Sequence, residues 1–590
     1  GIFVYLTTNT ANHPSVAIGD RVRVSGTPSE FNALTQVTIA AKSDVQVCAT
    51  GRPLPGPLPL SLPLTDDARE SAESMLVAPV GGFTVSDVYN TNRFGEVILA
   101  AGDKPAPIPT DVARPGTPEA LALRAANRAG RILLDDARTT NLATAGLAPA
   151  YLTKDDPVRV GDTVETFGPV VLGYGFNEWR LQPVDPANLT ATFKNTNPRT
   201  PAPANVGGDI RVASFNVLNY FVHFGGDARG ADDAAALAKQ QAKIVSAITA
   251  LDADVVALME IENSVRFEAD DPQEALRTLV GALNAADGAG TWDYVRSPAE
   301  LPAAAQQDFI TGAIIFKPGR VALKGAARSI NDETVWANAR EPIAQTFTAG
   351  GVTFSVVANH FKSKSASTPP STGDNADTGD GQGPFNGDRV RQATSLAAFV
   401  EQVKTSAGSD EVLLLGDFNA YTQEDPLQVL YGKGYTNLHS KAPGKSSYVF
   451  GGETGSLDHA LATASLTERV TGVDIWNINS VESFAYEYDG YAPFYSDGPY
   501  RASDHDPVVV GLETGASGPV DLQLLSINDF HGRLEPPTAG NGGAAQLVGL
   551  VDQLRTANPN TAWISAGVFL RESATVGTTI RNTSQIRLCC

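Results

Sequence analysis

The spacing of apolar and polar positions changes along the chain. The first 48 residues contain short apolar runs such as IFVYL and LTQVTIA, and VRV alternates as a half-buried strand does. Residues 66–193 contain further strand-like runs, including FGEVILA and RILLDDA. VGDTVETFGPV, ending in WRLQPV, echoes IGDRVRVSGTPSEF, ending in LTQVTI. We interpret this as a weak repeat of small β modules, although β-rich proteins also reuse GD-x-V turns.

Two proline-rich stretches divide this first part of the chain. RPLPGPLPLSLPL has too few backbone donors for a sheet and is interpreted as a linker. NTNPRTPAPANVGG, residues 195–208, is a second linker. These boundaries predict a β module at residues 1–50, with an incomplete start, and a second at residues 66–193.

A different pattern begins at residue 206. The strand IRVASFNVL is followed by a helical stretch, DDAAALAKQQAKIVSAITAL, with Asp232 as its expected N-cap. Its apolar face consists of Leu237, Ile244, Val245, Ile248 and Leu251. Further buried runs are ADVVALMEI, TGAIIF, FSVVANHF, EVLLLGDF and PVVVGL. Strands mixed with helices predict a layered α/β domain at residues 206–514.

Composition narrows the functional classes. The 590 residues suit three or four domains, and 42% hydrophobic residues are enough for several cores. A net charge of −21 provides no basic field to hold nucleic acid stably, yet bound cations would supply positive charge to a catalytic site. Three cysteines exclude a disulfide framework, and no apolar run is long enough to span a bilayer. The chain begins with Gly1, so we expect a processed or clipped start.

Polar residues recur where the buried runs of residues 206–514 end. They are Asn216, Glu260, Asn359, His360, Lys362, Lys364, Asp417, Asn419, Asp458, His459, Asp504 and His505. Strand ends that converge on one edge of a sheet bring such groups together. Because unpaired carboxylates repel one another, the cluster needs a cation. Oxygen ligands favour Mg²⁺, Mn²⁺ or Ca²⁺ over Zn²⁺.

Each of these residues also has an ordinary structural explanation. Asn216 is equally a backbone-bonding strand residue, Glu260 a solvated strand end, and His360 a core histidine. GDFN is equally an Asx turn, and Asp458 a helix cap. Their joint occurrence in one domain favours a common site.

In order along the chain, the motifs are SFNVLNY, LMEIEN, NHFKSK, GDFNA, LDHAL and SDHDP. Together they resemble the signature of the endonuclease/exonuclease/phosphatase superfamily, which has the DNase I-like fold, a four-layered α/β sandwich. More closely, the chain is similar to secreted bacterial nucleases with OB-like modules upstream. REPIAQTF (340–347) and GQGPFNGDRVRQA (381–393) match two further patterns of those nucleases.

This resemblance implies hydrolysis of a phosphodiester by in-line attack of water. His505 would be the general base, with Asp458 fixing its tautomer. Glu260 would hold Mg²⁺ or Mn²⁺, or else Ca²⁺, with Asp504 and Asn216 close by. Asp417 would orient the nucleophile or share the metal.

The resemblance also implies substrate contacts. Asn419 would bind the phosphate together with Asn216, and His360 would contact it or assist the leaving oxygen. Lys362 and Lys364 would add positive charge, unless they are only solubilising surface residues. Arg389 and Arg391 would contact backbone phosphates or else form an ordinary salt-bridged helix. Asp308 lies where the family often places another polar site residue.

Two segments stand apart from these motifs. The Gly/Asp-rich stretch at residues 368–388 is expected to be a mobile loop beside the site, with a structural Ca²⁺ site as the alternative. At residues 519–590, LLSINDFHGRL places Asp529 and His531 as in calcineurin-like metallophosphoesterases. Val568 stands where the next motif would have Asp. We therefore predict a truncated metallophosphoesterase segment without activity of its own.

The predicted architecture is multidomain: all-β OB-like modules, then the DNase I-like sandwich, then an incomplete α/β metallophosphoesterase segment. The predicted function is that of a secreted, extracellular or cell-surface nuclease. It would depend on a divalent metal and cut DNA, with RNA left open, at low sequence specificity. No stable protein partner is predicted. The alternatives are a phosphomonoesterase or phospholipase-type phosphodiesterase of the same fold, or a surface DNA-binding or adhesion protein with an inactive passenger domain.

Overall fold

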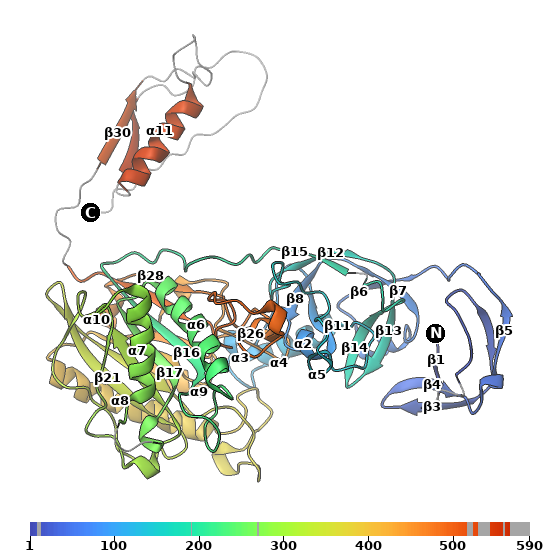
Figure 1. Ribbon diagram of the computed structural model, residues 1–590, viewed down its shortest axis with the longest axis horizontal. Helices are drawn as coiled ribbons and strands as arrows, with labels where there is room; N and C mark the ends of the chain where they lie inside the picture. Colours follow the sequence, from blue (N-terminus) through green and yellow to red (C-terminus); the bar gives the residue numbers. More distant parts are fainter. Residues whose placement is uncertain are drawn as a thin grey trace. The chain divides into compact units, whose positions relative to one another are not determined.

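The computed structural model describes residues 1–6, 8, 13–189, 191–267, 271–515, 523–528, 543–558 and 561–566. It divides into two compact units, residues 1–516 and 517–590 (Figure 1). Within the described residues, every helix is too short or too polar to cross a lipid bilayer.

Residues 206–514 are built on two six-stranded sheets. The first has the order β18-β19-β17-β16-β29-β28, formed by Asp293–Tyr294, Ile310–Phe316, Val255–Glu262, Ile210–Tyr220, Val508–Leu512 and Val470–Ile475. The second has the order β20-β21-β22-β23-β27-β24, formed by Ala322–Leu323, Arg340–Ala349, Val352–His360, Val412–Asp417, Asp458–Ala462 and Thr436–Asn437.

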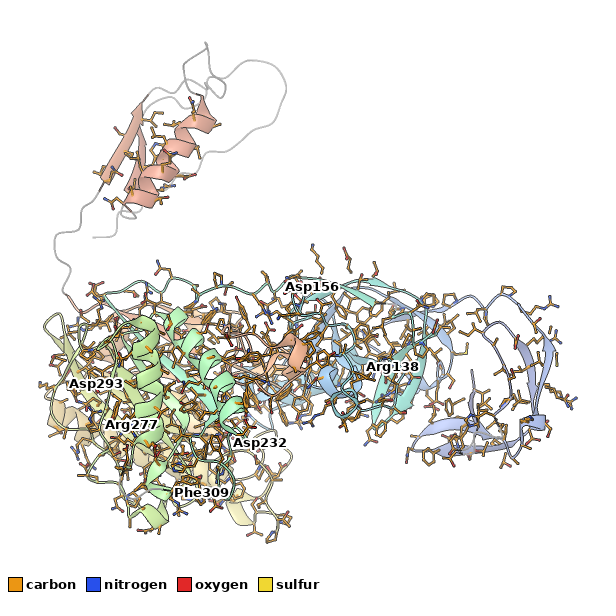
Figure 2. All side chains as sticks on the ribbon, viewed as in Figure 1. Arg138, Asp156, Asp232, Arg277, Asp293 and Phe309 are labelled. Carbon is orange, nitrogen blue, oxygen red and sulfur yellow. The ribbon has the colours of Figure 1, made fainter. Side chains whose placement is uncertain are left out.

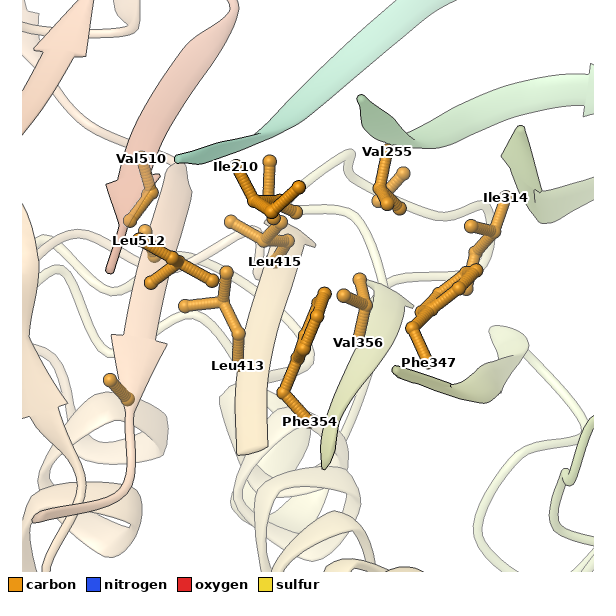
Figure 3. Close-up of a cluster of buried hydrophobic side chains, with 14 of the residues drawn as sticks. Ile210, Val255, Ile314, Phe347, Phe354, Val356, Leu413, Leu415, Val510 and Leu512 are labelled. Atoms are coloured by element: carbon orange, nitrogen blue, oxygen red, sulfur yellow. The ribbon is translucent and has the colours of Figure 1, made fainter. Parts of the chain in front are cut away.

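The two sheets pack face to face through their apolar side chains (Figure 3). Ile210, Val255 and Ile314 of the first sheet meet Phe354 and Leu413 of the second in one buried cluster. Alternate residues of each strand point the other way, as the two-residue period of a strand requires. Those outer faces are covered by helices: α6 (Ala234–Leu251) and α7 (Glu274–Asp287) on the first sheet, α8 (Asn386–Ala407) and α9 (Asp425–Gly432) on the second. This four-layered arrangement confirms the predicted sandwich.

Helix α6 begins one residue later than predicted. Its N-cap is Asp233, whose carboxylate accepts hydrogen bonds from the backbone N–H groups of Ala235 and Ala236, so the prediction of Asp232 as cap was wrong. Asp232 lies just outside the helix (Figure 2). Ile244 and Ile248 are fully buried, which confirms the predicted apolar face.

The module of residues 66–193 is part of a nine-stranded sheet of order β15-β12-β8-β9-β11-β14-β13-β7-β6. Its strands are Ala191–Lys194, Thr163–Phe167, Phe83–Asp87, Val97–Ala101, Arg131–Leu134, Glu178–Pro183, Val170–Gly175, Leu76–Val80 and Leu58–Ser61. It also has four short helices, at Asp66–Glu70, Thr91–Phe94, Pro109–Val112 and Leu142–Ala145. A longer helix, α4 (Pro118–Gly130), has Thr117 as its cap, so the module is not all-β.

The first proline-rich stretch was wrongly interpreted as a linker throughout. Leu58–Ser61 form β6, which pairs in parallel with β7. Because β6 is the last strand of its sheet, Pro59 lies on an edge strand, where a missing N–H is tolerated.

Residues 1–50 form two small sheets. Strands β1 (Phe3–Tyr5), β4 (Leu34–Thr38) and β3 (Thr27–Phe31) make one, and β2 (Arg21–Val24) pairs with β5 (Val45–Ala49) in the other. Most of their described side chains are exposed. The β-rich character agrees with the prediction, and the OB-like assignment stays a prediction.

The second unit, residues 517–590, contains β30 (Gln523–Asn528), α11 (Ala544–Ala557) and β31 (Thr561–Ala566). The two strands pair directly and in parallel, and α11 lies between them along the chain. Asp529, His531 and Val568 lie outside the described residues, so the metallophosphoesterase prediction stays a prediction.

Candidate active site

Glu260 is presented by an irregularity in two neighbouring strands. The register of β16 against β17 shifts between Asn216 and Tyr220, and Glu260 has a left-handed backbone with φ of 65°. Its carboxylate accepts hydrogen bonds from the Asn216 side-chain amide and the Asn219 backbone N–H, both at 3.0 Å. A left-handed non-glycine residue is strained, and such strain persists only when the surroundings hold it in place. Here these two hydrogen bonds hold Glu260.

The second sheet places three titratable residues side by side at one end of its neighbouring strands. His360 is in register with Asp417, and Asp417 is in register with Asp458. The close approach of these strands requires Gly416, which has φ of 132° and whose Cβ, if present, would lie 2.0 Å from the Asn359 carbonyl oxygen. The strand ends therefore converge as predicted.

His505 precedes β29 of the first sheet and joins this edge. Its Nδ1 lies 2.7 Å from Asp458 Oδ2, and Ser447 donates a hydrogen bond of 2.9 Å to the same oxygen. The Tyr448 ring packs on the imidazole at 4.5 Å between centroids. Burial alone would lower the pKa of His505, yet the carboxylates of Asp458 and Asp504 outweigh it and raise the pKa well above its ordinary value. The pair has the geometry of an oriented general base.

Glu260 and Asp504 form the candidate cation site. Burial, then the negative charge of Asp504, raises the pKa of Glu260. Among the described residues, no Lys or Arg forms an ion pair with either carboxylate, and no group of three Asp, Glu, His or Cys side chains is arranged as a metal site. Two poorly compensated carboxylates beside the Asn216 amide are hard oxygen donors that fit Mg²⁺ or Mn²⁺. These residues would hold the metal.

Arg340 is a site residue that the sequence analysis did not assign. Its guanidinium contacts His360 Nε2, and that nitrogen lies 3.5 Å from Asp417 Oδ2. Burial and the Arg340 charge hold the pKa of His360 well below its usual value, so the imidazole is neutral. Burial raises the pKa of Asp417 to about 7. The available signal was an arginine inside the buried strand REPIAQTF; Ser447 and Tyr448 carried no comparable signal.

Asn419 lies in the turn after β23. Its backbone N–H donates to Asp417 Oδ1 at 2.8 Å, and its side-chain amide donates to the Phe361 carbonyl at 3.1 Å. GDFN is thus an Asx turn, the structural alternative considered above, at the same edge as the other site residues. Lys362 is half-buried and lies over the Phe385 ring at 4.5 Å. The phosphate contacts of Asn419 and Lys362 stay predictions.

Two residues of the predicted substrate contacts already have partners within the fold. Arg389 is fully buried and donates to the carbonyls of Gln382, Pro384 and Lys362, so it stabilises the loop around residue 383. Lys364 Nζ lies 2.5 Å from Oε2 of the fully buried Glu424. The phosphate contact of Arg389 was wrong because its side chain is fully buried, whereas Lys364 is 19% exposed and its phosphate contact stays a prediction.

Three other predicted residues have mainly structural contacts. Arg391 forms ion pairs with Asp374 and Asp388, both at 2.5 Å, the salt-bridged alternative. His459 is buried in the core and donates from Nε2 to the Ala420 carbonyl at 2.8 Å. Asp308 is at the edge of the site, 4.0 Å from Arg340 Nη1.

The insertion at residues 368–388 is anchored to its surroundings. Asp374 binds Arg391, and Asp380 accepts a hydrogen bond from the Gln382 backbone. The Gly379 carbonyl accepts a hydrogen bond of 2.8 Å from Arg124 of the β module. Because the insertion's aspartates contact their own loop and Arg391, the arrangement does not support the calcium alternative.

Residues 213–505 match the model of the Endonuclease/Exonuclease/phosphatase family. No curated protein sequence matches the chain.

Similar solved structures include an endonuclease/exonuclease/phosphatase from Bacteroides vulgatus, with 14% identity over 52% of this chain and 98% of that one and a TM-score of 0.33. The human Nocturnin catalytic domain with bound sulfate has 17% identity over 51% and 93%, with a TM-score of 0.32. D. rerio TDP2 complexed with a single-strand DNA product has 13% identity over 51% and 97%, with a TM-score of 0.33. The family model covers most strands of the two sheets and all of the candidate site residues, and it identifies this part of the chain: residues 213–505 are a domain of the endonuclease/exonuclease/phosphatase family of phosphoester hydrolases.

Proposed function

We propose that the protein is a nuclease that depends on a divalent metal and cuts DNA with little sequence preference. The observation that carries this proposal is the 2.7 Å contact between His505 Nδ1 and Asp458, beside the Glu260 and Asp504 carboxylates. An oriented base next to a cation site is what hydrolysis of a phosphodiester needs.

The chemistry follows from the two imidazole nitrogens. Asp458 accepts the Nδ1–H. A divalent cation at Asp504 would offset the negative charge that raises the pKa of His505, and the neutral imidazole then has Nε2 to take a proton from the attacking water. After that transfer, Asp458 and Asp504 stabilise the imidazolium; Asp504 Oδ2 is 4.0 Å from Nε2. A divalent cation, when bound at Glu260 and Asp504, supplies positive charge to the phosphoryl oxygens.

Arg340 and His360, both on the second sheet, would bind the phosphate. Arginine keeps its charge even when buried, and its planar donors suit phosphate oxygens. The neutral His360 beside it offers a ring nitrogen without adding charge. Contacts of this kind bind phosphate and leave the bases unread, which supports low sequence specificity.

The parts outside the catalytic domain are included in the proposal. Strands β8, β9, β11, β14, β13 and β7 are hydrogen-bonded in succession, and β7 leads directly into β8 along the chain, which supports an OB-like barrel. We assign residues 519–590 to an incomplete metallophosphoesterase segment without activity of its own. We place the protein outside the cell because the chain resembles secreted nucleases; fractionation of producing cells tests this.

A plasmid assay tests the nuclease. Supercoiled DNA is incubated with the full chain and Mg²⁺, Mn²⁺, Ca²⁺ or EDTA, and with the variant His505→Ala. The expected result is metal-dependent degradation of the plasmid, which the substitution His505→Ala abolishes. The control variant His13→Ala, on the first module, should degrade the plasmid as the parent chain does. Intact plasmid with release of inorganic phosphate or lipid head groups would replace the nuclease by a phosphomonoesterase or phospholipase. Retention of DNA without cleavage would indicate a binding protein.

A further inference from the structure

The β module of residues 66–193 and the catalytic domain share one sheet. Strand β10 (Ala106–Pro107) of the module pairs in parallel with β26 (Glu453–Gly455), which pairs with β25 (Tyr448–Phe450). The turn of this β25–β26 hairpin is also held by the module. Ser86 donates to the Gly452 carbonyl at 2.7 Å, and Asp87 accepts from the Gly452 N–H at 2.9 Å. The hairpin begins at Tyr448, the residue that packs on His505.

A buried ion-pair network fixes the module against the domain. Arg159 of the module lies 2.7 Å from Glu482 of the domain, and their side chains are only 1% and 0% exposed. Arg199, from the connecting stretch between them, reaches the other Glu482 oxygen at 2.8 Å. Removing one partner would leave an uncompensated buried charge, so this contact holds the two parts in a fixed arrangement.

Between them lies a cavity of about 550 Å³ that reaches the active site. Tyr89 and Asn90 line it from the module, and Tyr448, Phe450 and Asp504 line it from the domain. Cavities of this size hold small molecules or one residue of a polymer. The module therefore forms one wall of the space next to the candidate cation site.

Apart from Asp504, which belongs to the candidate cation site, the charged groups that line this cavity are already paired. Asp87 accepts hydrogen bonds from two backbone N–H groups, Glu96 pairs with Arg180, and Arg131 pairs with Glu178. The groups still available are aromatic rings: Tyr89 is 53% exposed and Phe450 is 65% exposed. An edge contact with Phe484, at 4.8 Å between centroids, supports the Tyr89 ring. Exposed rings with few free charges suit a flat, uncharged group better than a phosphate.

We propose that this cavity binds an unpaired nucleobase next to the scissile phosphate, stacked on Tyr89 and Phe450. The proposal rests on the nuclease function and deepens it. A base inside a duplex is already stacked and paired, so only a single strand or an extruded nucleotide offers its face to these rings. The preferred substrate is then single-stranded DNA, and the β module takes part in selecting it.

The test compares a single-stranded oligonucleotide with an abasic oligomer of equal length, which keeps the phosphates and lacks every base. Its readout is the ratio of kcat/KM for the first over the second, measured on the full chain with Mg²⁺. In Tyr89→Ala and in Phe450→Ala the ratio is expected to fall about tenfold, within the range for loss of one base–aromatic stack. Phe176→Ala, which removes a 90% exposed ring elsewhere on the module, should keep the ratio.

A second measurement reports stacking without catalysis. His505→Ala is mixed with a single strand that carries 2-aminopurine, whose fluorescence is quenched on stacking. The His505→Ala protein should quench the fluorescence, and the double variant with His505→Ala and Tyr89→Ala should not. If the parent chain cleaves neither oligomer and no duplex DNA either, both this inference and the nuclease proposal fail. If it cleaves both equally, prefers duplex, or keeps its ratio in the two variants, the nuclease stands and the base site is refuted.

Discussion

The Asp458→Asn substitution tests the chemistry of the site most directly. Asparagine keeps the size of aspartate and removes the negative charge that faces the imidazole at 2.7 Å. It also offers an N–H in place of one oxygen, which favours the wrong tautomer of His505. The fold should tolerate the change because Asn fills the same space.

The size of the effect follows from electrostatics. Opposite charges centred about 4 Å apart at an effective dielectric constant of about 20 interact by about 4 kcal/mol. This stabilisation arises only when His505 becomes charged in the transition state, so its loss lowers kcat by roughly 10³-fold. The binding of DNA should change little because Asp458 itself is buried.

The assay is steady-state cleavage of a fluorescent oligonucleotide at saturating Mg²⁺, with thermal melting to confirm folding. Ser447→Ala is the matched control, since it removes a neutral donor to the same Asp458 oxygen. That control should lose less than about tenfold, in line with one neutral hydrogen bond. If Asp458→Asn keeps more than about a tenth of the parent kcat, His505 is not a base that Asp458 orients.

Three further predictions follow from the site and the core. EDTA should abolish cleavage, and Mg²⁺ or Mn²⁺ should restore it. In a metal titration, Glu260→Gln should raise the metal concentration that gives the half-maximal rate at least about tenfold. Arg340→Lys, which keeps the charge and loses the planar fork beside His360, should lower kcat/KM about 10- to 100-fold in the oligonucleotide assay. Burial lowers the pKa of Lys243 to about 8. Between about pH 8 and 10.5 the native state therefore binds fewer protons than the unfolded state, and the free energy of unfolding rises with pH. Relative to Lys243→Met, the parent chain should gain about 3 kcal/mol over that window in urea unfolding; a flat difference would contradict the shift.

The sandwich and most of the polar edge were predictable from the sequence because their signals are local. Buried strands such as β23 are continuous apolar runs, and a polar residue at the end of such a run is expected to lie at the end of the strand. Asp417 and Asp458 are brought together by strand pairing alone. A pattern of runs and ends therefore contains the information for this part of the site.

The rest depends on contacts that no local pattern encodes. Arg389 has the sequence context of an exposed helical cation, and it is buried because the loop before α8 folds over it. The left-handed conformation of Glu260 arises from a register shift shared by two strands. Pro59 argued against a strand, but edge strands tolerate it.

The position of the β module has the same origin and the largest consequence. Its own sequence predicts strands and contains no sign of what they face. The short pairing of Ala106 with Glu453 and the buried Arg159–Glu482 contact are formed only when both parts are folded. Since β26 is paired on one side with the module and on the other with the strand that starts at Tyr448, any displacement of the module is transmitted to the ring that packs on His505. The candidate catalytic groups come from residues 213–505, but the shape of the space in front of them depends on both parts. For this reason, a domain removed from its module should differ from the full chain in the substrate that it prefers.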